Sequence, residues 1–159
     1  MKILMTDDDS DDRLLALFAF KKLNAAHSID FVSNGQELLD YLDARVESNS
    51  ELPNLILLDL NMPKVDGREA LNKIKSNPRL KNVEVIIYST SASEEDKQLT
   101  KNLGARDYIL KPSSQRELIN IFRKICDDLV TQPGWHYFIE PENAKKNGKP
   151  SSKGNNEKP

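Results

Sequence analysis

The chain of 159 residues lacks most features that mark secreted, membrane or nucleic-acid-binding proteins. Its one cysteine, Cys126, cannot form an internal disulfide, as is usual for proteins of a reducing compartment. No apolar run approaches the roughly 20 residues that a membrane helix needs, and the N-terminus reaches an acidic run too soon for a signal peptide. The net charge of −2 gives no overall electrostatic case for nucleic-acid binding. We therefore expect a soluble cytoplasmic protein, long enough for one domain with a full core.

Short apolar runs alternate with helical patterns along most of the chain. The runs cover residues 2–6, 28–32, 54–59, 83–89 and 106–110, and the helical patterns cover 11–24, 35–46, 67–76, 94–103 and 115–130. Asn34, Asp66 and Ser114 each precede a helical pattern and have Glu three residues later, a spacing typical of helix N-caps. The regular alternation predicts an α/β fold with a parallel sheet and helices on both faces.

Polar residues stand at the ends of four of these runs. They are Asp7, Asp8 and Asp9 after the first run, Asp59 at the end of the third, Ser89 and Thr90 at the end of the fourth, and Lys111 before Pro112 after the fifth. In open α/β sheets, ligands bind at the carboxyl ends of the strands. Dense acidic charge favours a bound cation, and a lysine and a hydroxyl can contact a phosphoryl group. The set therefore predicts Mg2+-assisted phosphoryl transfer onto a carboxylate.

Two other acidic motifs can be compared with the first acidic run. An EF-hand loop would use Asp7, Asp9 and Asp11, but Asp12 and Phe18 replace the glycine and glutamate that this loop requires. A haloacid-dehalogenase-like aspartyl phosphohydrolase would use Asp7 as nucleophile and Asp9 as second acid, although Asp11 falls where that family has Thr or Val. The phosphohydrolase stays as the alternative function, and it predicts turnover of small phosphoesters.

Residues 1–130 resemble the receiver domain of bacterial two-component response regulators. The resemblance is carried by the acids after the first strand, by LILLDLNMPKVDG at 55–67, by the hydroxyl after the fourth strand and by DYILKP at 107–112. It implies a flavodoxin-like three-layer sandwich, in which a five-stranded parallel sheet of order 2-1-3-4-5 is covered by five helices.

The resemblance also implies a role for each residue of the site. The phosphoacceptor is Asp59, the Mg2+ ligands are Asp7, Asp8, Asp59 and the backbone carbonyl of Asn61, the phosphate contacts are Lys111 and Ser89, and the switch residues are Ser89 and Tyr108. Because three aspartates follow one another, Asp8 and Asp9 are the alternative acidic pair. The phosphoryl donor would be a sensor histidine kinase or a histidine phosphotransfer protein. The protein would catalyse its own phosphorylation and dephosphorylation, and it would act as a signalling switch rather than a metabolic enzyme.

The first helical pattern is apolar on two faces. One stripe suits the core and contains Leu15, Ala16, Ala19, Phe20 and Leu23. A second stripe contains Leu14, Leu17 and Phe18. Because a helix that is apolar on two sides usually hides both, we predict that the second stripe docks the helical domain of a histidine kinase. The alternative is that one or two of its residues pad the edge of the core.

The composition changes after residue 130, so we divide the chain into a receiver domain at 1–130, an aromatic extension at 131–142 and a disordered polar tail at 143–159. Trp135, Tyr137, Phe138 and Ile139 make the extension apolar. We expect it to fold back on the domain, with contact to a second subunit as the alternative. The tail contains five lysines spread among small polar residues, which favours a solvated tail over nucleic-acid binding.

No room remains for an output domain after residue 130, so we expect a stand-alone regulator that acts on a downstream protein target. Its brevity, its polar loop at 45–54 and its aromatic extension are similar to those of the single-domain regulators paired with phytochrome-type kinases. Those relatives often dimerise, which makes a homodimer an expectation for this chain.

Overall fold

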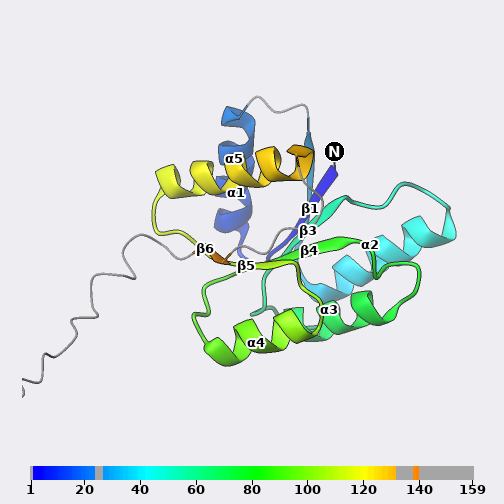
Figure 1. Ribbon diagram of the computed structural model, residues 1–159. Helices are drawn as coiled ribbons and strands as arrows, with labels where there is room; N and C mark the ends of the chain where they lie inside the picture. Colours follow the sequence, from blue (N-terminus) through cyan, green and yellow to red (C-terminus); the bar gives the residue numbers. More distant parts are fainter. Residues whose placement is uncertain (1, 24–26, 132–137, 140–159) are drawn as a thin grey trace, which may run out of the picture.

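A parallel sheet forms the centre of the computed structural model, which describes residues 2–23, 27–131 and 138–139 (Figure 1). Its strands are β1 (Lys2–Thr6), β2 (Ser28–Val32), β3 (Leu55–Leu58), β4 (Glu84–Ser89), β5 (Asp107–Leu110) and β6 (Phe138–Ile139). They lie in the order β2-β1-β3-β4-β5-β6, and every neighbouring pair is parallel. The order 2-1-3-4-5 predicted for the first five strands is confirmed, and β6 extends the sheet by one short strand.

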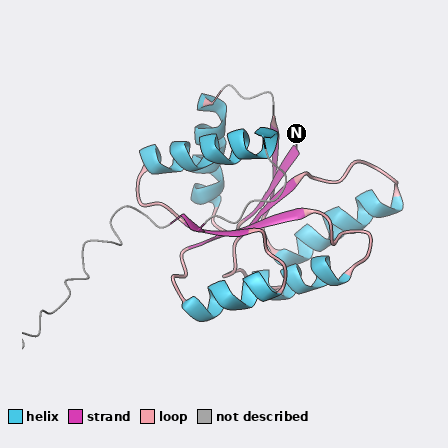
Figure 2. Cartoon of the chain, in the orientation of Figure 1, coloured by secondary structure: helices cyan, strands magenta, loops and turns pink. Residues whose placement is uncertain are grey.

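Helices cover both faces of the sheet and alternate with the first five strands along the chain (Figure 2). They are α1 (Ser10–Lys22), α2 (Gly35–Glu47), α3 (Gly67–Ser76), α4 (Glu94–Asn102) and α5 (Gln115–Thr131). Figure 1 shows α1 and α5 on one face and α2, α3 and α4 on the other, which confirms the flavodoxin-like three-layer sandwich. None of the helices in the described ranges is long and apolar enough to cross a membrane.

Strict alternation along the strands divides the core into two halves. Leu55 and Leu57 of β3 pack on the α1 and α5 side, whereas Ile56 and Leu58 pack on the side of α2 and α3. All four side chains are buried, as expected for a central strand of a parallel sheet with both faces covered. This continuous apolar strand ends immediately before Asp59, so the core brings that carboxylate to the edge of the sheet.

Helix α1 has a narrower core face than the sequence predicts. Ala16, Ala19 and Phe20 are buried, and the Phe20 ring meets the Phe122 ring of α5 edge-on at a centroid distance of 6.3 Å. Leu15 is 44% exposed, so its prediction as a core residue is wrong. The reason is geometric, because Ala16, Ala19 and Phe20 pack in one core cluster with residues of α5, and Leu15 is turned about 100° away from Ala16.

Local signals at the helix starts agree with the predictions. The side chains of Asn34 and Asp66 accept hydrogen bonds from backbone N–H groups in the first turns of α2 and α3. Ser114 Oγ accepts the backbone N–H of Glu117 at 3.3 Å. Gly67 lets α3 begin against the end of β3, because a Cβ at this position would lie 2.1 Å from the backbone oxygen of Asp59. The start of α3 is therefore packed directly on the candidate site.

The C-terminal extension contributes β6 to the described structure. The backbone of Phe138 pairs with Tyr108 of β5, and that of Ile139 pairs with Ile109. This pairing is the part of the predicted fold-back that lies within the described residues. Trp135, Tyr137 and the tail at 143–159 lie outside them, and the boundaries proposed for the extension and the tail stay predictions.

Candidate functional site

The acids and the lysine singled out in the sequence meet at the carboxyl edge of the sheet. Thr6 of β1 is paired with Leu58 of β3, so Asp7 and Asp59 leave adjacent strands side by side. The backbone N–H of Asp59 donates to the Thr6 oxygen at 3.0 Å, which continues the ladder to that residue. Asp7 and Asp59 are both buried. Two buried carboxylates next to each other need compensating positive charge.

Lys111 supplies one such charge from the end of β5. Its Nζ donates hydrogen bonds to Asp12 Oδ2 at 2.8 Å and to Asp59 Oδ2 at 2.9 Å, and it lies 2.8 Å from Asp7 Oδ2. Its side chain is only 9% exposed. Burial alone would lower the Lys111 pKa, but the contacts with Asp12, Asp7 and Asp59 outweigh burial and raise the pKa above its ordinary value. The ammonium is therefore held charged among three carboxylates.

The two carboxylate oxygens of Asp7 have few partners in this arrangement. Its Oδ1 accepts the backbone N–H of Asp9 at 3.0 Å. Its buried Oδ2 lies 2.8 Å from Lys111 Nζ in an ion pair and has no further partner among the described residues. Burial raises the pKa of Asp7 to about 6, and the lysine only partly opposes this rise. A buried carboxylate oxygen whose one partner is a shared ammonium can also coordinate a metal ion.

A group of three carboxylates has the donor set of a cation site. Asp7, Asp8 and Asp59 each offer an oxygen, and these oxygens lie within 4.8 Å of one another. Asp9 stands apart from them, because its side chain caps α1 by accepting the Asp11 backbone N–H at 2.8 Å. Oxygen ligands from carboxylates are those that Mg2+ prefers. Asp7 and Asp8, rather than Asp8 and Asp9, therefore group with Asp59.

Asn61 lies next to this group in the loop after β3. Its backbone N–H donates to Asp59 Oδ1 at 3.2 Å, while the other oxygen of Asp59 is bonded to Lys111. Asn61 itself is exposed, so the end of the loop is open to solvent beside the buried aspartate. Both oxygens of Asp59 are thereby oriented before any ligand binds.

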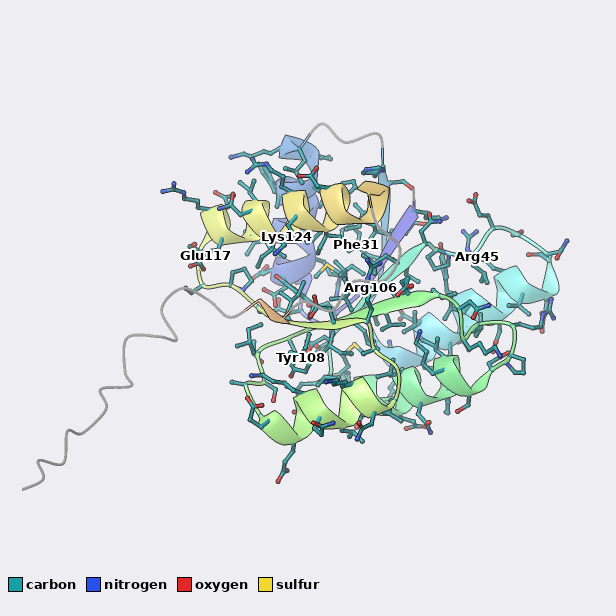
Figure 3. The ribbon with its side chains drawn as sticks, viewed as in Figure 1. Phe31, Arg45, Arg106, Tyr108, Glu117 and Lys124 are labelled. Carbon is teal, nitrogen blue, oxygen red and sulfur yellow. The ribbon has the colours of Figure 1, made fainter. Side chains whose placement is uncertain are left out.

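Ser89 and Tyr108 lie on neighbouring strands and are linked through the loop after β4. Ser89 is fully buried, and its Oγ accepts the backbone N–H of Ser91 at 3.3 Å. The Tyr108 hydroxyl donates to the backbone oxygen of Ser91 at 2.8 Å. Tyr108 is buried between the sheet and α4 (Figure 3), and burial raises the pKa of its hydroxyl. Thr90, the neighbour of Ser89, is exposed.

Asp96 of α4 fixes the same loop from its other side. One of its oxygens, Oδ1, accepts from Arg68 of α3 at 2.7 Å, and the other, Oδ2, accepts the Ser91 hydroxyl at 2.6 Å. Burial alone would raise the Asp96 pKa, but these partners lower it below its ordinary value. Sequence reasoning missed this link, because Asp96 resembles any acid in the first turn of a helix.

Asp12 and Tyr88 also belong to the site and were missed. Asp12 lies in the first turn of α1, where an acid is expected for the helix dipole alone. Tyr88 precedes Ser89 on β4, is buried, and has its ring centroid 5.7 Å from Lys111 Nζ. An aromatic residue within an apolar strand has no signal that separates a site residue from a core residue. Asp12 accepts a hydrogen bond from Lys111, and the Tyr88 ring lies beside the same ammonium.

Comparisons with known proteins agree with the fold. The sequence model of the response regulator receiver domain matches residues 3–123. Response regulator Rcp1 of Synechocystis sp. is 36% identical over 124 residues, which are 77% of this chain and 84% of Rcp1. The crystal structure of the phosphorylated cyanobacterial phytochrome response regulator RcpA aligns with a TM-score of 0.75 and 37% identity, covering 82% of this chain and 94% of RcpA. The Mn(2+)-bound form of Rcp1 aligns with a TM-score of 0.70 and 35% identity, covering 78% and 90%.

Proposed function

Because the chain belongs to the family of response regulator receiver domains, we propose that Asp59 accepts a phosphoryl group from a partner protein and that this event switches protein contacts. The observation that carries the proposal is the buried Asp59 carboxylate, hydrogen-bonded to Lys111 and flanked by Asp7 and Asp8. A nucleophile, a fixed cation and an acidic group at one strand edge are the parts that phosphoryl transfer to a carboxylate requires.

The acidic group fits Mg2+. Asp7, Asp8 and Asp59 would hold the ion together with the backbone carbonyl of Asn61, and the unsatisfied Oδ2 of Asp7 supports this assignment. When bound, a divalent cation neutralises phosphoryl oxygens and the crowded carboxylates. The manganese-bound structure of the relative Rcp1 supports a divalent ion in a site of this kind.

The chain's own residues would perform the transfer as follows. An oxygen of Asp59 attacks the phosphorus of a partner's phosphohistidine, and the phosphorus–nitrogen bond breaks as the phosphorus–oxygen bond forms. Lys111 donates hydrogen bonds to phosphoryl oxygens and offsets their charge, since its raised pKa keeps the ammonium protonated. Water attack on the acyl phosphate returns Asp59 to its free carboxylate. Both steps occur on the regulator itself, and its output is a signal rather than a metabolite.

Ser89 and Tyr108 would convert the new phosphate into a change of surface. The Ser89 hydroxyl lies at the end of β4, and its proton can be donated to a phosphoryl oxygen. A shift of Ser89 would move Ser91 with it, and Tyr108 would lose the carbonyl that its hydroxyl now contacts. The loop, α4, β5 and α5 would then favour a second arrangement, which a downstream protein target distinguishes from the first.

The docking surface for the phosphoryl donor is proposed on α1. Leu14 is 57% exposed and Phe18 is 56% exposed, one turn apart on the same helix, and Leu17 beside them is half-buried. A sensor histidine kinase or a histidine phosphotransfer protein presents a helical surface that these side chains can pack against. Because α1 also carries Asp12 into the site, a partner docked here lies near Asp59.

Variants on α1 test this docking surface. Leu14→Glu and Phe18→Glu should each block transfer from a kinase that phosphorylates the wild type, while phosphorylation by acetyl phosphate continues. Leu99→Glu on α4 is the matched control, since Leu99 is an exposed leucine on the other face of the sheet. Kinase transfer that is unchanged in both α1 variants would refute the docking surface.

The relatives support a proposal for the kind of partner. RcpA is a phytochrome response regulator, so we infer a phytochrome-type sensor kinase as the donor, and a cytoplasmic protein target downstream. A homodimer is also proposed by similarity. Sedimentation of the phosphorylated and unphosphorylated chain would show whether the dimer exists and depends on phosphorylation.

The first test is intact-protein mass spectrometry after incubation with acetyl phosphate and Mg2+. Wild type should gain one phosphoryl group, and both EDTA and Asp59→Asn should abolish the gain. A wild type that gains none and releases no phosphate in a metal-dependent way would contradict the proposal. Steady turnover of small phosphoesters that survives Asp59→Asn would instead indicate an aspartyl phosphohydrolase.

A further inference from the structure

Lys111 has a third carboxylate partner that stands outside the acidic group. Its Nζ faces Asp7, Asp59 and Asp12 at 2.8, 2.9 and 2.8 Å. Asp7 and Asp59 also belong to the group whose oxygens suit a cation, and Asp12 does not. Among the described residues, Asp12 is therefore the one of these three carboxylates that contacts Lys111 without also belonging to the acidic group.

The other two partners change during the proposed reaction. Asp59 becomes an acyl phosphate, and Asp7 has a buried oxygen suited to a cation. A lysine side chain has many rotamers, so an ammonium that loses its partners also loses its orientation. Asp12 reaches the lysine from the first turn of α1, and it neither accepts the phosphoryl group nor belongs to the acidic group.

We propose that Asp12 is a positioning residue for phosphoryl transfer, which holds the Lys111 ammonium in place before, during and after phosphorylation of Asp59. The inference rests on the proposed function, because it assigns Asp12 a task within that reaction. The Asp12 side chain is 32% exposed, so water screens its charge, whereas its hydrogen bond to the largely buried ammonium has a defined direction. The hydrogen bond that orients Lys111 therefore affects the rate of transfer more than the repulsion between the Asp12 carboxylate and the phosphoryl group does.

Two substitutions separate the effect of the hydrogen bond to Lys111 from the effect of the negative charge at position 12. Asp12→Ala removes both the acceptor and the charge, whereas Asp12→Asn removes the charge but keeps an acceptor oxygen at the same length from the backbone. Asp11→Ala is the matched control. It lies in the same turn and removes the same charge, and the exposed Asp11 carboxylate makes no hydrogen bond or ion pair with any described residue.

The experiment measures the rate of phosphorylation by acetyl phosphate with Mg2+, using intact-protein mass spectrometry. Asp12→Ala should slow the reaction about tenfold, as expected when a reacting group is misplaced by a fraction of an ångström. Asp12→Asn should retain at least about half of the wild-type rate, and Asp11→Ala should match wild type. Faster phosphorylation in both Asp12 variants would show that the charge repels the phosphoryl group, and would overturn the proposal.

A second measurement needs neither metal nor phosphoryl donor. Acetylation of Lys111 by acetic anhydride in EDTA, followed by peptide mass spectrometry, reports how firmly the ammonium is held. The rate should rise several-fold in Asp12→Ala and stay unchanged in Asp11→Ala. Equal rates in all variants, by both measurements, would overturn the role of Asp12. If wild type accepts no phosphoryl group, the proposed function fails, yet the acetylation rates still report whether Asp12 anchors Lys111.

Discussion

Acidification should stabilise the metal-free protein, which is unusual for a domain rich in carboxylates. Burial raises the pKa of Asp7 from 3.8 to about 6. The native state therefore binds this proton more tightly than the unfolded chain does. The resulting stabilisation is complete below pH 3.8 and is lost as the pH rises through about 6. This stabilisation is not offset above about pH 5 by the carboxylates with lowered pKa values, because they stay ionised there. These are Asp30, Glu37 and Asp96.

The size of the effect follows from proton uptake. Between about pH 7.5 and about pH 5, native Asp7 goes from almost fully ionised to mostly protonated, while the unfolded residue stays ionised. This difference adds about 1.4 kcal/mol to the free energy of unfolding, the value of one pKa unit. Urea denaturation in EDTA, followed by far-UV circular dichroism at both pH values, measures it.

Asp7→Asn is the comparison that isolates this residue. The variant has no proton to take up at position 7, so its free energy of unfolding should lack the gain. Wild type and Asp7→Asn with the same pH dependence would refute the reasoning. Mg2+ added to wild type at the higher pH should stabilise it, because the cation replaces the proton as the compensating charge.

Three further changes test the surroundings of the site. Gly67→Ala should lower the free energy of unfolding by about 3 kcal/mol, because its Cβ would clash with the backbone oxygen of Asp59. A change below about 1 kcal/mol in urea denaturation would contradict this. Tyr88→Leu should shorten the lifetime of the phosphorylated protein about fivefold through loss of the ring beside Lys111, whereas Tyr88→Phe should not. Asp96→Ala should speed amide hydrogen exchange in the loop after β4 while exchange in β1 stays the same, and uniform protection would show that the carboxylate does not restrain the loop.

Strand and helix positions are largely predictable because each element has a local signal. The apolar run that ends before Asp59 becomes β3, and caps at Asn34 and Asp66 begin α2 and α3 as predicted. The error at Leu15 has a different origin. Periodicity shows that α1 has apolar faces, but the width of the buried face depends on where α5 lies across it.

The places of the three consecutive aspartates also depend on the tertiary structure rather than on a local signal. Three consecutive aspartates look alike in the sequence, and each could follow a strand or cap a helix. In the fold, β1 ends at Thr6 and α1 starts at Ser10, which leaves Asp9 as the cap and turns Asp7 inward beside Asp59. The choice depends on where two elements end relative to each other, a property that no single residue determines.

The sequence by itself determined the fold class, the strand order through family resemblance, and the meeting of Asp59 with Lys111. These follow from the sequence because parallel strands bring their carboxyl ends to one edge, whatever the details of packing. Only the tertiary structure decided that Asp12 shares the lysine, at a separation of 99 residues. Such a contact depends on the angle and distance at which α1 packs beside β5, and an acid in the first turn of a helix has the same local signal whether or not it meets a partner.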